Sequence, residues 1–251
     1  MKAVTKIATL VATTLLAGGA AATSLDYRAE YKHDSKEYTH RIKLGDSTTI
    51  NDKTKLSFGI EQKFNSQDKS NYWDEMVRGD SEFDWGVRYA LNKKWYLQPG
   101  MPITFASDKT TYKPQFRVGF TSSFGLTTAL RYRHEFQVYS SEAGTKTLTD
   151  GTKVSVASKT VEQGKLTLTG SYKFADKELQ KIKLSYEANY NKNYDEVRLY
   201  NGDKDWQWDA GIIAGYQIGD FRPYVELWNV QVSSSTDERQ LRTRLGLKYY
   251  F

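Results

Sequence analysis

The feature that most constrains the fold of this chain is an alternation of apolar and polar residues with a period of two. In the first such segment, residues 25–32, apolar side chains occupy the odd positions and charged side chains the even ones. Successive side chains of a β-strand point to opposite faces, so the pattern predicts strands with one apolar face. We find no amphipathic helix and twelve segments of this kind: residues 25–32, 41–44, 55–61, 82–89, 95–105, 112–120, 126–138, 165–174, 181–190, 206–218, 221–227 and 241–251.

The connections between these segments alternate between short and long. Short turns are expected at residues 46–52, 91–93, 122–125, 175–178 and 219–220, and longer polar loops at 65–79, 107–111, 139–164, 191–204 and 231–237. The connection at 33–36 is the exception, because it is short where a long one is expected. Short turns at one rim and long loops at the other are typical of an outer-membrane barrel. The loop at 139–164 is rich in Ser, Thr and Lys, and we expect it to be mobile.

A soluble sandwich or lipocalin-like barrel would show the same alternation with its apolar face turned inward. Three features favour the membrane. Aromatic residues make up 14% of the chain and gather near strand ends, as at a lipid interface. The polar face is charged along every strand, which suits a water-filled lumen. The chain ends with Leu245, Leu247, Tyr249 and Phe251 at a spacing of two, and a last strand ending in Phe resembles the assembly signal of outer-membrane barrels.

We therefore predict an all-β protein that forms a single closed 12-stranded antiparallel transmembrane β-barrel. An even number of strands and full closure leave no sheet edge exposed to lipid. No stretch after the N-terminus approaches the ~20 apolar residues that a membrane helix needs.

The N-terminus has the composition of a cleavable export signal. Lys2 and Lys6 precede an apolar run at 7–16, and small residues at 18–22 supply an A-x-A-like cleavage site. We predict a signal peptide at residues 1–22 and the barrel at 23–251; a short buried helix is the alternative for the first segment. Loss of two lysines lowers the net charge from +6 to +4, which is 34 bases minus 30 acids. An exported chain without cysteine suits the outer membrane of a Gram-negative bacterium.

The polar strand positions, placed in the lumen, are strongly biased toward bases. The basic positions are Arg28, Lys32, Arg41, Lys43, Lys55, Lys63, Arg88, Lys113, Arg117, Arg131, Arg133, Lys165, Lys173, Lys181, Lys183, Arg222, Arg242, Arg244 and Lys248. The acidic positions are fewer: Asp26, Glu30, Glu61, Glu82, Asp84, Glu135, Glu187, Asp205, Asp209 and Glu226. A basic, low-dielectric channel concentrates anions, so the pattern predicts an anion-selective pore.

The lumenal arginines fall on two groups of strands that a twelve-stranded barrel would place on opposite walls. The first basic track is Arg117, Arg131 and Arg133; the second basic track is Arg28, Arg222, Arg242, Arg244 and Lys248. Arginine forks bind carboxylates through two parallel hydrogen bonds, so each track could hold an acidic oligomer. The alternative interpretation is that these bases only balance lumenal acids in a salt-bridge network.

Five segments in order resemble the oligogalacturonate-specific porin family. They are LDYRAEY at 25–31, Pro99-Gly100 followed by YKPQFR at 112–117, RYRHE at 131–135, PYVE at 223–226 and RTRLGLKYYF at 242–251. The resemblance covers the whole mature chain. It implies a monomeric twelve-stranded channel with both termini in the periplasm and with facing basic tracks for acidic oligosaccharides. The loop at 139–164 has no feature that matches this family.

The leading hypothesis is a passive channel for acidic oligosaccharides such as oligogalacturonate; galacturonate, alginate and sialic acid remain open as the sugar. Its expected partners are these sugars, outer-membrane lipid, lipopolysaccharide and the barrel assembly machinery, with no nucleic acid, metal or cofactor. A barrel enzyme, either a phospholipase or a protease, is the main alternative. However, His134 lies on the lipid-facing parity, and Phe136 occupies the place of the serine that a phospholipase would need. We therefore predict no catalytic residue. A non-conducting adhesin or structural barrel is the third possibility.

Overall fold

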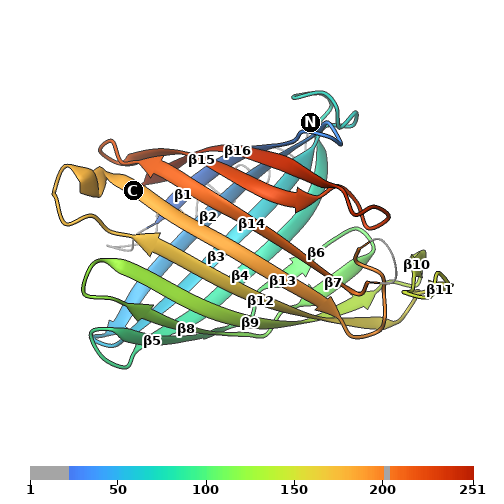
Figure 1. The fold of residues 1–251 in the computed structure, drawn as a ribbon, viewed down its shortest axis with the longest axis horizontal. Coiled ribbons are helices and arrows are strands. Elements are labelled where there is room, and N and C mark those ends of the chain that lie inside the picture. Colours follow the sequence, from blue (N-terminus) through green and yellow to red (C-terminus); the bar gives the residue numbers. More distant parts are fainter. Residues whose placement is uncertain (1–22, 201–203) are drawn as a thin grey trace, which may run out of the picture.

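The wall of the molecule is one antiparallel sheet that closes on itself. The computed structural model describes residues 23–200 and 204–251, so the predicted signal peptide at 1–22 lies outside the described residues. The first strand, β1 (Ser24–Lys32), pairs on one side with β2 (Glu37–Asn51) and on the other with the last strand, β16 (Arg239–Tyr250). Figure 1 shows the strands inclined to the long axis of the barrel. The predicted closed twelve-stranded barrel is confirmed.

Between β2 and β16 the wall follows the order of the chain. Its strands are β3 (Thr54–Asn65), β4 (Val77–Ala90), β5 (Trp95–Gly100) continued by β6 (Ile103–Phe105), β7 (Lys109–Tyr112) continued by β8 (Gln115–Thr121), β9 (Leu126–Tyr139), β12 (Thr160–Tyr172), β13 (Ile182–Asn193), β14 (Trp206–Tyr216) and β15 (Phe221–Gln231). A separate hairpin, β10 (Thr145–Thr147) and β11 (Lys153–Ser155), belongs to the loop between β9 and β12. One short 3₁₀ helix, η1 (Leu179–Lys181), lies between β12 and β13.

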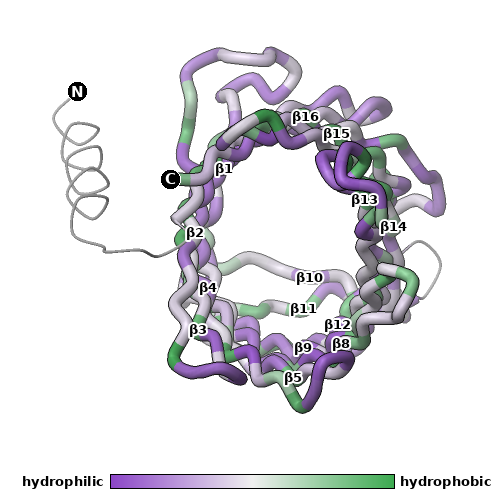
Figure 2. The backbone as a smooth tube through the Cα atoms, turned by 90° about the vertical axis from the view of Figure 1, so that its left-hand side faces the viewer, coloured by the Kyte–Doolittle hydropathy of each residue, from purple (hydrophilic) through white to green (hydrophobic). Residues whose placement is uncertain are grey.

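Apolar side chains cover the outside of the barrel and polar side chains fill the inside. Ile60, Ile212 and Leu245 are each about 60% exposed, whereas Thr167 and Glu226 are buried. Figure 2, viewed along the barrel, shows the strands arranged in a closed ring. Within the described ranges, no helix is both long and apolar enough to cross a bilayer. A soluble sandwich or lipocalin-like barrel would have its apolar side chains inside and its polar side chains outside. The observed distribution is the reverse, so that alternative is wrong.

One strand is much longer than the alternation predicts. We expected a strand at 41–44 and a turn at 46–52, but β2 continues to Asn51 and meets β3 through Asp52 and Lys53. The next two outward positions after Leu44 are Asp46 and Thr48, which are polar. The apolar alternation thus ends before the strand does, because it marks only part of the strand's outer face.

Two strands of the wall are each interrupted by a short segment that contains a proline. Pro102 separates β5 from β6, and Pro114 separates β7 from β8. The pairs Gly100↔Gln115 and Ile103↔Tyr112 show that the register is the same on both sides of the interruption. Proline has no N–H to donate to the ladder, although its carbonyl still accepts. Lys113 N donates to Pro102 O at 2.9 Å, and His134 N donates to Pro114 O at 3.0 Å.

The loop at 139–164 is folded to an extent that its composition does not predict. β12 begins at Thr160 within it, and the β10–β11 hairpin occupies its middle. Tyr139, Ala143, Val156, Val161 and Val197 form a buried apolar cluster there.

The pairing of β16 with β1 gives the last residue a structural place. Phe251 N donates to Thr23 O at 3.0 Å, and its ring packs edge-on against Tyr249 at 4.7 Å between ring centroids.

Deleting Phe251 should reduce the amount of folded barrel in the outer membrane, because closure loses its terminal anchor. The measurement is the fraction of protein whose gel mobility changes on boiling. Phe124→Ala, which removes an exposed aromatic ring from the β8–β9 turn, is the matched control. Equal folded fractions in both variants would show that Phe251 is not needed for assembly.

Candidate functional site

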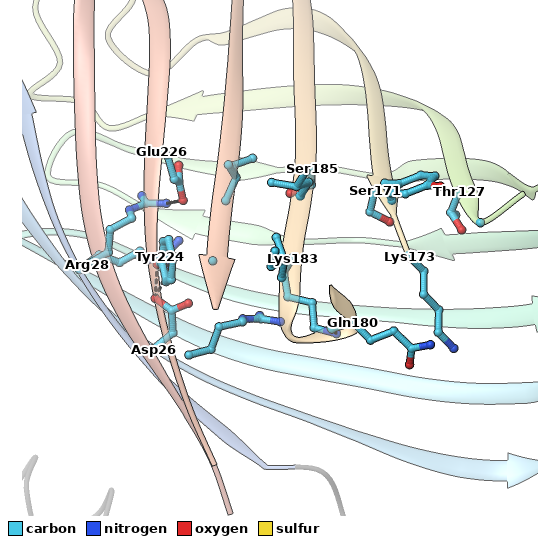
Figure 3. Close-up of a pocket in the computed structure, with 18 residues that line it drawn as sticks. Asp26, Arg28, Thr127, Ser171, Lys173, Gln180, Lys183, Ser185, Tyr224 and Glu226 are labelled. Atoms are coloured by element: carbon cyan, nitrogen blue, oxygen red, sulfur yellow. Dashed lines mark hydrogen bonds and ion pairs between the residues drawn. The ribbon is translucent and has the colours of Figure 1, made fainter. Parts of the chain in front are cut away.

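The inward-facing side chains of β1, β2 and β15 line a cavity of about 540 Å³ inside the bore. Its lining includes Asp26, Arg28, Arg41, Tyr224 and Glu226 on one side. Figure 3 shows Lys173, Gln180 and Lys183 on the other. A second cavity of about 380 Å³ shares Arg28 and Arg41 with the first and is lined further by Glu30, Glu61, Lys63, Arg242 and Arg244. Neither cavity is lined by Arg117, Arg131 or Arg133.

Arg244 of the second basic track is held by carboxylates from both neighbouring strands. The register places Arg244 opposite Glu30 on β1 and Glu226 on β15. Its Nε lies 2.6 Å from Glu30 Oε2, and its Nη1 lies 2.9 Å from Glu226 Oε2. Two longer contacts extend the network: Arg28 to Glu226 at 3.7 Å and Arg242 to Glu30 at 3.8 Å.

Arg41 on β2 completes this network beside Arg28. Its two terminal nitrogens contact Asp26 at 2.7 Å and Glu61 at 3.3 Å. The side chains of all these residues are largely buried, at 10–16% exposure. The network therefore pairs four arginines with four carboxylates: Arg28, Arg41, Arg242 and Arg244 with Asp26, Glu30, Glu61 and Glu226. Its formal charges cancel, so we call it the neutral network.

Trp228 supports the same arginines from the wall. Its indole N–H donates to Glu226 at 2.7 Å, and the guanidinium groups of Arg242 and Arg244 lie 4.9 and 5.1 Å from the ring centroid. The ring lies over Gly211, where an added Cβ would come within 2.3 Å of it. Sequence reasoning missed Trp228. The available signal was a tryptophan on the polar parity of β15, but only the register shows that it faces a glycine.

The remaining bases of the second track lie near the end of the barrel where the chain terminates. Arg222 pairs across the strands with Lys248, and both lie over the ring of Tyr250, at 5.2 and 5.0 Å from its centroid. Among the described residues, neither has a carboxylate within ion-pair distance. These two bases therefore stand outside the neutral network.

The first basic track has a different environment. Arg117 lies directly opposite Arg131 on the neighbouring strand, and Arg133 lies between Gln115 and Lys165. In the part of the chain that the structure describes, its ion pairs reduce to one long contact, from Arg133 Nη1 to Glu135 at 3.8 Å. Like charges are thus adjacent on this wall without the carboxylates that neutralise the other.

Neutral side chains orient the guanidinium groups of this track. Arg133 donates from Nε and Nη2 to Gln115 Oε1, at 3.0 and 2.9 Å. Arg131 Nη2 donates to Thr167 Oγ1 at 3.1 Å, and the Thr167 hydroxyl donates to Asn189 Oδ1 at 2.8 Å. The Nε of Arg131 is buried and has no hydrogen-bond partner among the described residues.

The two tracks lie on opposite sides of the sheet's closed order. Four wall strands, β12 to β15, separate β9 from β16 on one side, and β2 to β5 separate β1 from β8 on the other.

One base that the sequence pattern assigned to the lumen is misplaced. Lys181 lies in η1, exposed, where its ammonium contacts Glu178 at 2.7 Å. The alternation of β13 was extended one residue too far, into the turn. Lys109 was missed because β7 begins earlier than expected; its Nζ donates to Gln137 at 2.6 Å.

His134 lies on the outer face of β9, as its parity predicts. One ring nitrogen lies 2.9 Å from Glu162 Oε2 and the other 3.1 Å from the Tyr132 hydroxyl. Its ring packs against Phe136 at 4.6 Å between centroids, so no serine occupies that position. The described residues hold no cluster of three or more His, Asp or Glu side chains arranged to bind a metal.

Comparison with known proteins places the whole barrel in one family. Residues 16–251 match the family described as oligogalacturonate-specific porin protein, KdgM. The chain is 28% identical over 249 residues to the oligogalacturonate-specific porin KdgM of Dickeya dadantii, covering 98% of this chain and 99% of the relative. Among solved structures, a NanC porin superposes with a TM-score of 0.65 at 16% identity, over 90% of this chain and 98% of the other. A KdgM porin superposes with a TM-score of 0.59 at 20% identity, over 91% and 99%. The resemblance seen in the sequence is confirmed: this chain belongs to the oligogalacturonate-specific porin family.

Proposed function

We propose that this porin conducts acidic oligosaccharides, oligogalacturonate foremost, and that the first basic track makes the main contacts with their carboxylates. The observation that carries the second part is the difference between the two walls. Arg117, Arg131 and Arg133 are clustered and make one long ion pair among the described residues, whereas four arginines in or beside the second track are matched by four carboxylates. An anion crossing the bore therefore meets uncompensated charge on one wall.

The spacing of the first track suits a polymer of acidic sugars. Arg131 and Arg133 project from one face of β9, about 7 Å apart at ~3.4 Å of rise per residue. This distance is of the order of the spacing between carboxylates along such a chain. Exposed ion pairs contribute only about 0–1 kcal/mol each, so contacts with a chain in a wet bore stay weak enough for release.

The neutral network holds the shape of the opposite wall in this proposal. A salt-bridge network was the alternative interpretation of all the lumenal bases, and we assign it to Arg28, Arg242 and Arg244. Arg222 and Lys248, which lie outside that network, would extend the attraction for anions toward the terminal end of the barrel.

Several expectations about the cellular setting accompany this function. We propose export through the signal peptide at 1–22, insertion into the outer membrane by the barrel assembly machinery, and contact with lipopolysaccharide as a monomer. The family membership supports an outer-membrane location. The oligogalacturonate ligand is the one named for relatives.

Reversing the charge of the first track tests the main proposal. Arg131→Glu combined with Arg133→Glu should lower anion selectivity and slow the uptake of acidic oligosaccharides several-fold, while the flux of neutral sugars changes little. The effect should shrink in 1 M salt, where the Debye length falls to about 3 Å. The measurements are the reversal potential across a salt gradient and swelling rates of liposomes that contain the porin.

The matched control is Lys53→Glu combined with Lys181→Glu. It makes the same change in net charge on two exposed turns outside the bore. If the double arginine variant folds and still passes oligogalacturonate as fast as the control does, the first track is not the substrate path.

Glu226→Gln tests the role assigned to the neutral network. The substitution keeps a hydrogen-bonding group but removes the charge that Arg28 and Arg244 share, so it should lower the free energy of unfolding by about 1–3 kcal/mol. The bore should also become more anion-selective, because one buried positive charge is released from compensation. Urea unfolding in lipid vesicles measures the first effect and reversal potential the second. Glu238→Gln, on an exposed loop, should change neither. A Glu226 variant as stable as wild type would remove the structural role.

A further inference from the structure

We propose that residues 140–159, the mouth hairpin, form a fixed constriction at one end of the bore that admits oligosaccharides according to their width. The inference rests on the proposed function, since it concerns the same conducted sugars. It adds selection by shape to selection by charge.

The mouth hairpin lies across the end of the barrel where the long loops gather. Figure 1 shows β10 and β11 just beyond the rim formed by the ends of β9, β12 and β13. Figure 2, seen along the bore, shows the same segment crossing it from the side of β12 to the side of β4.

An apolar cluster fixes the base of the mouth hairpin against the inner side of the wall. Tyr139 is the last residue of β9 and Val161 the second of β12, and they have the same parity as the lumenal Arg131 and Lys165. They pack with Ala143, Val156 and Val197, and all five are at most 8% exposed. Apolar side chains on the inward side of the wall would otherwise be exposed to the water in the bore, which is unfavourable, and this explains why the loop folds back over these residues.

Backbone hydrogen bonds tie the mouth hairpin to two neighbouring loops. Thr149 N donates to Glu196 O and Arg198 N donates to Thr147 O, both at 2.9 Å, around the bridge between Leu148 and Val197. On the other side, Ser140 N donates to Asp108 O at 2.8 Å. A segment held from two sides and by a buried cluster acts as part of the wall rather than as a loose loop.

Two lysines keep this narrow place favourable to anions. Lys109 Nζ lies 5.0 Å and Lys146 Nζ 5.7 Å from the centroid of the Tyr139 ring, on β7 and β10 respectively. A linear acidic chain would thus meet positive charge where the opening is reduced. A branched or folded chain of the same charge would be excluded by width.

The constriction can be removed while the five buried residues at its base are kept, although Leu148, which packs against them, is lost. Val156 N donates to Gly144 O at 3.2 Å, which is the hydrogen bond that closes a two-residue hairpin turn. Replacing residues 145–155 by two glycines therefore keeps Ala143 and Val156 in the cluster. The deleted segment contains Lys146, Asp150 and Lys153, a net charge of +1. Lys153→Gln, which loses the same charge with the hairpin intact, is the matched control.

The readout is the size limit for neutral sugars, because they report width and not charge. The shortened variant should show higher single-channel conductance and a swelling cut-off shifted toward larger and branched neutral oligosaccharides, whereas Lys153→Gln keeps the wild-type limit. An unchanged conductance and cut-off in a variant that folds would overturn the constriction. If the wild-type porin shows no preference for acidic over neutral oligosaccharides, the proposed function is wrong, but the result on the size limit still holds.

A second variant does not depend on the shortened loop folding. The chain has no cysteine, so Thr152→Cys at the exposed tip can be labelled selectively with a bulky thiol reagent. Labelling should lower the swelling rate most for the largest permeant sugars, and labelling Ser234→Cys in the β15–β16 loop should not. Equal effects at both positions would show that the mouth hairpin has no special place in the path.

Locking the mouth hairpin distinguishes a fixed constriction from a moving lid. Leu148 and Val197 form an antiparallel bridge pair, a separation that a disulfide can span. Oxidising Leu148→Cys combined with Val197→Cys should leave the flux of linear trigalacturonate unchanged relative to the reduced form. A drop in flux on oxidation would overturn a fixed constriction, since it would mean that the hairpin has to move.

Discussion

The whole structure depends on the need to pair every backbone N–H and C=O group that lies in lipid. Hydrocarbon offers no alternative hydrogen-bond partner, so a sheet can cross the bilayer only if its first and last strands meet. The pairing of β1 with β16 along their length satisfies that requirement. Closure then fixes the two faces: the apolar positions face outward, and the alternate positions of the same strands, most of them polar, are directed into one bore.

That bore has to accommodate many charges close together, and its two walls do so differently. Around Arg28 and Arg244 the chain supplies its own carboxylates, from strands β1, β3 and β15. Around Arg131 it supplies a hydroxyl and an amide instead, through Thr167 and Asn189. Neutral hydrogen-bond acceptors orient a guanidinium without cancelling its charge. The second solution leaves that charge available to a passing anion, and the first does not.

The sequence predicted the barrel and the strands that carry each track, because alternation reports which face of a strand a residue occupies. It could not predict which carboxylate meets which arginine. Glu30 and Glu226 flank Arg244 only in the observed register, and register depends on pairings between strands far apart in the chain. The extension of β2 was invisible because Asp46 and Thr48 break the apolar pattern. The mouth hairpin was invisible because its Ala143 and Val156 are buried only by packing with Val197, which belongs to another loop.

The adjacent prolines in the wall have a mechanical consequence. Pro102 and Pro114 lie on neighbouring wall strands, and Pro99 lies close by on β5, so the ladder lacks several donors in one small area. A closed ring of hydrogen-bonded strands resists deformation about equally all round, but a ring that lacks several hydrogen bonds in one area deforms most easily in that area. Lateral pressure from the bilayer would therefore make the cross-section oval along a fixed direction. The first basic track begins on β8, beside these prolines. Such a deformation would therefore change the distance between the two tracks before it changed any other dimension of the bore.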